Sequence, residues 1–164
     1  MKLSWTFTAA GLLSAIGAIP APAQAIRVGT FHKPSVIVAF YSSPMWSEVL
    51  KAKKAEMQQA KAANDTKKAQ DLDAWGGAQQ DLAHRQLSGD APIDNILEAL
   101  APMFPDIAKT AQVSLIAPDL PYASPAVQTV DLTDLLLDAL KANDNVRKIA
   151  RELQSQKGPL PPLH

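Results

Sequence analysis

The chain has 164 residues, with 16 Lys and Arg against 16 Asp and Glu, and it contains no cysteine. A net charge near zero argues against a nucleic-acid-binding protein, because such proteins carry a basic footprint. The lack of cysteine excludes disulfide bonds, thiol catalysis and Cys-ligated metal, so stability depends on packing or oligomerisation.

The first 25 residues are predicted to be a secretory signal peptide. Lys2 provides a basic start, residues 3–19 carry no charge, and Pro20 ends the apolar stretch. Small residues then match the pattern required by signal peptidase, so we expect cleavage after Ala25 or after Ala23. An uncleaved anchor is the alternative, but a spanning helix needs about 20 apolar residues. The chain is therefore expected to be exported.

The remainder, residues 26–164, has a length typical of one domain. Residues 26–31 alternate apolar with polar or small side chains and predict a short, half-buried strand. Residues 34–42 are ambiguous. Their β-branched run favours a strand, whereas Pro34 suits the first turn of a helix.

Residues 44–88 predict a hairpin arm of two helices. Ser43 and Pro44 are typical of a helix start. Apolar residues then recur at helical spacing in two stripes: Met45, Trp46, Val49, Leu50 and Met57, followed by Leu72, Trp75, Ala78 and Leu82. Between the stripes, Asp65 or Thr66 can cap the second helix. Gly76–Gly77 indicates either a kink or the close approach of another helix.

The rest of the chain predicts short strands and helices. Residues 88–92 indicate a helix stop and a new helix start. Strands are expected at 113–117 and 127–130, on either side of a proline-rich loop with Tyr122. Two amphipathic helices follow, with these apolar residues: Leu132, Leu135, Leu136, Ala139 and Leu140, then Val146, Ile149, Ala150 and Leu153. Either Asp131 or Thr133 can cap the first of them.

These elements predict one domain over residues 26–156. Its fold class is α+β and helix-rich, with a small β body of short strands and a protruding helical hairpin. Residues 157–164 are rich in proline and are predicted to be disordered.

No motif points to catalysis, so we predict a protein that is not an enzyme, with no metal or cofactor. Asp81 and His84 lie at i, i+3 and could touch. A solvated helix contact explains this pair, while a small hydrolase or ligand-binding domain would need a pocket enclosing both residues and Tyr122. Asp131, Asp134 and Asp138 share a face, which we interpret as solvated.

Within the predicted arm, residues 51–68 are rich in lysine: Lys51, Lys53, Lys54, Lys61, Lys67 and Lys68, opposed in this segment only by Glu56 and Asp65. One interpretation is solubility. The other is attraction to acidic clients or anionic lipid, at about 1 kcal/mol per basic residue near an anionic surface. Trp46 and Trp75 are further candidates for client contact, with packing inside the arm as the alternative.

The order of elements resembles the OmpH/Skp family of periplasmic chaperones. Residues 122–140, from Tyr122 through Pro125 to the leucine-rich helix, are similar to the family's ending. Ile26–Gly29 resembles its first strand, and Ser43–Pro44 its entry into the hairpin. The resemblance favours a short helix at 34–42.

The resemblance implies a periplasmic chaperone of the cell envelope. In that family, strands from three subunits form a β body, and coiled-coil arms hold unfolded outer-membrane proteins. This chain departs from the pattern in two ways. Arms of about 20 residues would reach only about 30 Å, and the segment from Asn143 onward has no counterpart. An oligomeric envelope scaffold without holdase activity is therefore the alternative function.

Overall fold

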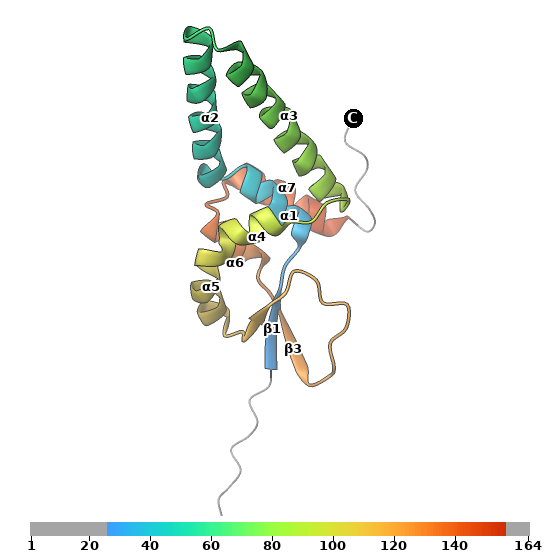
Figure 1. The fold of residues 1–164 in the computed structure, drawn as a ribbon. Coiled ribbons are helices and arrows are strands. Elements are labelled where there is room, and N and C mark those ends of the chain that lie inside the picture. Colours follow the sequence, from blue (N-terminus) through green and yellow to red (C-terminus); the bar gives the residue numbers. More distant parts are fainter. Residues whose placement is uncertain (1–25, 157–164) are drawn as a thin grey trace, which may run out of the picture.

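The computed structural model describes residues 26–156 (Figure 1). The predicted signal peptide, 1–25, and the predicted disordered segment, 157–164, lie outside the described residues. The described part is helix-rich with a small three-stranded sheet, as the predicted α+β class requires. Among residues 26–156, no helix is both long and apolar enough to cross a bilayer.

The sheet is parallel, with the strand order β2-β1-β3. Its strands are β1 (Ile26–Thr30), β2 (Leu115–Ile116) and β3 (Val127–Asp131). The predictions for the first and third strands are confirmed, but the strand expected over 113–117 has only two residues. Val113 is lost to the strand because its N–H donates to the Ala108 carbonyl of the preceding helix, whereas the Ser114 and Ala117 N–H groups still donate to the Arg27 and Gly29 carbonyls of β1.

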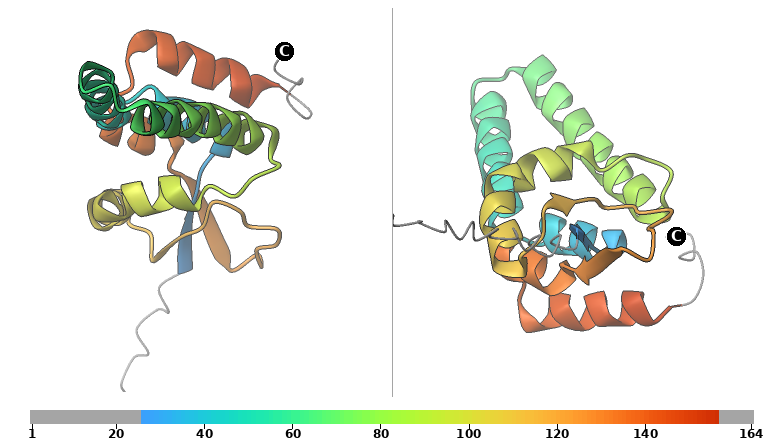
Figure 2. Two further views of the ribbon diagram at one scale, coloured as in Figure 1. Left: turned by 45° about the horizontal axis from the view of Figure 1, so that its top comes forward. Right: turned by 90° about the horizontal axis from the view of Figure 1, so that it is seen from below.

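Residues Lys33–Tyr41 form helix α1, so the strand expected from β-propensity is wrong and the helix favoured by the resemblance is correct. Pro34 occupies the first turn, where its missing N–H costs nothing. Val36, Ile37 and Ala39 are at most 1% exposed. A helix that is apolar all round is a buried helix, and α1 lies at the centre of the domain (Figure 2).

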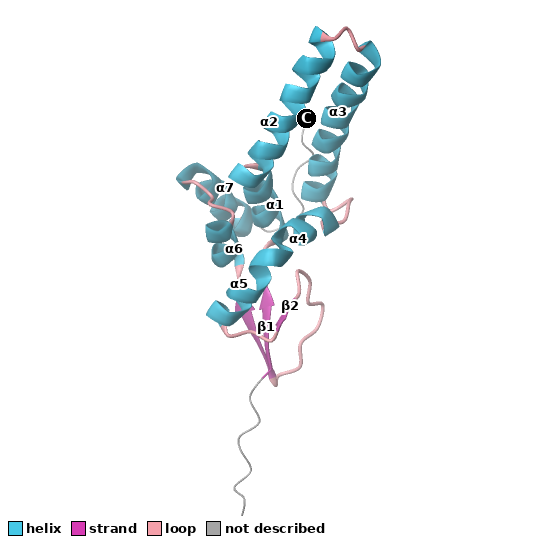
Figure 3. Ribbon diagram, turned by 60° about the vertical axis from the view of Figure 1, so that its left-hand side comes forward, coloured by secondary structure: helices cyan, strands magenta, loops and turns pink. Residues whose placement is uncertain are grey.

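The arm consists of α2 (Pro44–Ala62) and α3 (Thr66–Ser88). The Ser43 hydroxyl accepts a hydrogen bond from the Trp46 N–H at 3.2 Å, and Asp65 caps α3 through the Lys68 N–H at 3.0 Å. Gly89, with φ of 85°, ends α3 in the left-handed conformation that glycine favours. The two helices meet at the turn and diverge toward α1 (Figure 1), and the arm and the sheet lie at opposite ends of the molecule (Figure 3).

Of the two explanations offered for Gly76–Gly77, the close approach of another helix is wrong. A Cβ atom added to either glycine would meet nothing within 4 Å, so no other helix approaches there. Helix α3 also runs unbroken through both residues. Gly29 is different, since an added Cβ would lie 2.3 Å from the buried Leu132 side chain. Glycine at position 29 therefore lets Leu132 pack directly against β1.

Five further short elements complete the domain: α4 (Asp94–Leu100), the 3-10 helix η1 (Ala101–Met103), α5 (Phe104–Ala111), α6 (Thr133–Ala139) and α7 (Asp144–Ser155). The helix start expected within residues 88–92 is displaced to Asp94, and the Asp90 carboxylate accepts a hydrogen bond from the Ser88 hydroxyl at the end of α3. Asp131 caps α6 through the Thr133 N–H at 2.8 Å, and Asn143 caps α7. The core surrounds α1, with Leu136 and Ile96 fully buried.

Candidate functional site

The lysines of the arm fall into two groups. Lys51 pairs with Glu48 at 2.7 Å, and Lys53 pairs with Glu56 at 3.1 Å while lying 5.8 Å from the Trp75 ring centroid. The others are exposed, with no carboxylate of residues 26–156 at ion-pair distance: Lys54, Lys61, Lys67 and Lys68. The structure therefore separates two neutralised lysines from four free ones.

Three of the free lysines surround the turn between α2 and α3, and we call Lys61, Lys67 and Lys68 the cationic tip. The only acidic side chain within the turn is Asp65, which is occupied in capping α3. Farther along α3, Asp71, Asp73 and Asp81 are exposed. Three of the four free lysines thus lie at the end of the arm that is most distant from the sheet.

The two tryptophans lie between elements of the arm and its base. Trp46 and Trp75 stack with centroids 6.2 Å apart, and Tyr41 meets Trp46 edge-on at 5.1 Å. Both tryptophans are half-buried. This geometry corresponds to the packing alternative, in which stacked aromatic rings hold α2 and α3 together.

Gln86 is a structural residue that the sequence did not single out. It is 3% exposed, and its Oε1 accepts from the Tyr41 hydroxyl at 2.8 Å. Its Nε2 donates to the Pro92 carbonyl at 2.7 Å and to Asn95 at 2.6 Å. A single glutamine on a mostly polar helix carries no sequence signal of burial. Only the folded structure shows that its hydrogen bonds connect α3 to α1 and α4.

Asp81, His84 and Tyr122 do not form a site. Asp81 lies 3.7 Å from Arg85 rather than pairing with His84, which is exposed. Tyr122 is 76% exposed in the loop between β2 and β3. None of the three residues lines either of the two cavities at the base of the arm. They therefore do not form the pocket that a hydrolase using them would need.

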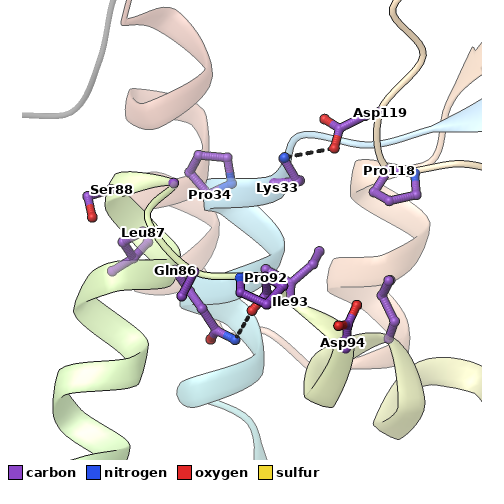
Figure 4. A pocket seen from close by; sticks show the side chains of 13 residues that line it. Lys33, Pro34, Gln86, Leu87, Ser88, Pro92, Ile93, Asp94, Pro118 and Asp119 are labelled. Atoms are coloured by element: carbon purple, nitrogen blue, oxygen red, sulfur yellow. Dashed lines mark hydrogen bonds and ion pairs between the residues drawn. The ribbon is translucent and has the colours of Figure 1, made fainter.

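Two cavities flank the base of the arm. The first, of about 400 Å³, lies between the end of α3, the start of α1, the following loop with α4, and the residues after β2 (Figure 4). At its rim, Lys33 Nζ is 2.9 Å from an Asp119 carboxylate oxygen. The second, of about 300 Å³, has these lining residues: Ser43, Pro44, Met45, Glu48, Met103, Ala139, Leu140 and Lys141. Neither brings together a recognisable set of catalytic groups.

A polar network joins the carboxyl ends of β1 and β3 to α7. The His32 N–H donates to the Thr133 hydroxyl at 2.9 Å, and His32 Nδ1 lies 2.8 Å from the Ser35 hydroxyl. Ser35 in turn donates to the Ala150 carbonyl at 2.9 Å, so Nδ1 is the protonated nitrogen of the neutral ring. Burial lowers the pKa of His32, against the opposing effect of the Asp131 carboxylate. Within residues 26–156, no group of acidic, histidine or cysteine side chains could hold a metal ion.

Replacing His32 with asparagine is expected to make stability less sensitive to acid. The folded pKa of His32 lies below its ordinary value of 6.5. As the pH falls below that value, the unfolded chain therefore binds more protons than the folded chain, and the free energy of unfolding decreases. Urea titrations at about pH 7 and about pH 5 should show a smaller fall in the free energy of unfolding for His32→Asn than for the unmodified protein. His84→Asn, at an exposed position, is the control, and equal falls in all three proteins would contradict the prediction.

One face of the sheet is incompletely covered. Ile26 pairs in register with Val127, and Val28 with Leu115, so these four side chains lie on one face. Ile26 is 60% exposed and Leu115 is 56% exposed, whereas Val28 on the same face is only 4% exposed. Within the described residues, β2 and β3 are edge strands with no further partner. Exposed apolar side chains beside unpaired edges are typical of a surface that another chain covers.

Comparison with known proteins found no match among family models, curated proteins or solved structures. Two features of the described residues face outward: the cationic tip at one end and the partly apolar sheet at the other. Exposed lysines can attract anionic or acidic partners, and exposed apolar side chains can pack against another chain.

Proposed function

We propose that the mature chain is a non-catalytic, periplasmic chaperone-like protein that holds unfolded or envelope proteins through its hairpin arm. The observation that carries the proposal is the cationic tip, whose three exposed lysines have no acidic partner among residues 26–156. The resemblance to the OmpH/Skp family supports it through the order of elements. The arm's position opposite the sheet leaves the tip free to reach a client (Figure 3).

Client contact in this proposal is largely electrostatic. Trp46 and Trp75 stack on each other, which reduces the apolar surface that the arm can offer. Each lysine near an anionic surface contributes about 1 kcal/mol, and exposed charges are screened at high ionic strength. Holding of acidic clients, or contact with an anionic membrane surface, should therefore weaken as salt is added.

The proposal includes a homo-oligomer formed through the sheet. Support comes from the exposed Ile26 and Leu115 beside the unpaired edges of β2 and β3. Three subunits is the number implied by the family resemblance. Association would bring several arms to one client, which raises the effective affinity of weak individual contacts.

The test uses the mature protein, residues 26–164, and an unfolded outer-membrane β-barrel protein diluted from urea. We expect suppression of light scattering that is weakened by salt and lost in the triple variant Lys61→Gln, Lys67→Gln, Lys68→Gln. The matched control removes equal charge from exposed lysines elsewhere, with Lys109→Gln, Lys141→Gln and Lys148→Gln. Mass determination in parallel reports the oligomer.

An oligomeric envelope scaffold without holdase activity is the second candidate. It is favoured by the packing of both arm tryptophans within the arm. A defined oligomer that leaves scattering unchanged would support the scaffold and overturn the chaperone proposal. Equal loss of suppression in the two triple variants would show that the cationic tip has no special role.

A further inference from the structure

The cavity of about 400 Å³ at the end of α3 has the size of a small-molecule site, since ligand pockets usually measure about 300–1,000 Å³. It borders the carboxyl edge of the sheet, where Lys33 and Pro34 follow β1, and Pro118 and Asp119 follow β2. In open parallel α/β sheets, ligands bind outside the carboxyl ends of the strands. Figure 4 shows the lining side chains around the opening between α1, α3 and α4.

Much of the lining is apolar. Its wall consists of these residues: Pro34, Leu87, Pro92, Ile93, Leu97 and Pro118. Leu87 and Leu97 are only half-buried, so part of this apolar surface is still in contact with water. A ligand that covered both leucines would be stabilised by the removal of that surface from water. The wall therefore favours a ligand with an apolar body.

The polar side chains of the lining have little left to offer an anionic ligand. Both amide hydrogens of Gln86 are donated within the protein, and the Ser88 hydroxyl hydrogen is taken by acceptors of its own segment. Lys33 is neutralised by Asp119, because its Nζ lies 2.9 Å from a carboxylate oxygen. The lining thus has no uncompensated positive charge among the described residues.

Negative charge, in contrast, is in excess. Asp94 and Asp119 both line the cavity, and Lys33 is the one basic residue of its lining. Asp94 has no cationic partner among residues 26–156. An ionised carboxylate only accepts hydrogen bonds, and its strong partners are ammonium and guanidinium groups. The charge of the lining therefore complements a cation.

We propose that this cavity binds a small amphiphilic cation, which is a molecule with an apolar body and one ammonium or guanidinium group. The apolar body contacts Leu87, Ile93 and Leu97, and the cationic group pairs with Asp94. A small molecule fits this lining better than an extended peptide, because a peptide also needs partners for its main-chain hydrogen bonds. The proposal does not depend on the proposed chaperone function.

The test uses ¹⁵N-labelled protein of residues 26–164 and three small probes at about pH 7. Hexylamine is an ammonium ion at that pH, hexanoate has a chain of the same length with the opposite charge, and methylamine has the positive charge without the chain. We expect hexylamine to shift the amide signals of Leu87, Ile93 and Leu97, but not those of Met45 and Ala139 in the second cavity. Hexanoate and methylamine at the same concentration should shift none of them.

The variant Asp94→Asn keeps the shape of the lining and removes the charge. It should weaken hexylamine binding about tenfold, because hydrogen bonds to charged groups are stronger than neutral ones. Asp106→Asn is the matched control, since Asp106 is also exposed in the first turn of its helix but lines neither cavity. Four results would overturn the proposal: no shift with hexylamine, equal binding of hexanoate, similar shifts at both cavities, or equal affinities of the two variants.

Discussion

The Ile37→Ala variant is expected to lose about 2–5 kcal/mol of unfolding free energy, the usual cost of truncating a buried isoleucine. Ile37 is 1% exposed at the centre of α1, where α3, α6 and α7 pack around the helix. Alanine is the better helix former by only a few tenths of a kcal/mol. The loss of packing therefore exceeds the gain in propensity, and urea unfolding followed by circular dichroism measures the difference.

Val49→Ala is the matched control for Ile37→Ala. Val49 is also a β-branched residue within a helix, but it is 39% exposed on α2. Because surface substitutions usually change stability by no more than about 0.5 kcal/mol, Val49→Ala should leave the unfolding midpoint almost unchanged. Similar losses in both variants would contradict a fully buried α1.

The Gln86→Leu variant is expected to lose about 2–4 kcal/mol, since a buried polar group left unpaired typically costs about 1–3 kcal/mol. The substitution keeps the side chain's approximate volume but leaves the Tyr41 hydroxyl, the Pro92 carbonyl and Asn95 without this partner. The base of α3 would loosen, so amide hydrogen exchange at the end of α3 should accelerate more than exchange in α2. Urea unfolding gives the global loss.

Gln80→Leu serves as the control for Gln86→Leu, because Gln80 is exposed on the same helix. Tyr41→Phe removes one of the three hydrogen bonds and should produce a smaller loss than Gln86→Leu. If Gln86→Leu were no more damaging than Gln80→Leu, the hydrogen bonds of Gln86 would contribute nothing to the attachment of the arm.

The hairpin and most of its boundaries could be predicted from the sequence, because local chemistry decides them. Ser43 caps α2 and Asp65 caps α3 within one helical turn of each residue, and Gly89 supplies the conformation that ends α3. The position of the cationic tip also depends on local sequence. Once residues 63–65 form the turn, the lysines on either side of it must lie at the end of the arm.

Only the tertiary structure decided the features that depend on distant segments. Residues 36–38 have strand propensity, yet they form a helix because neighbouring elements bury every side of it. Gln86 became important through partners on α1 and in the loop before α4. The first cavity is lined by residues 33–34, 86–89, 91–94, 97 and 118–119, which folding alone brings together. Short-range signals specify caps and turns, whereas burial and enclosure depend on the whole packed chain.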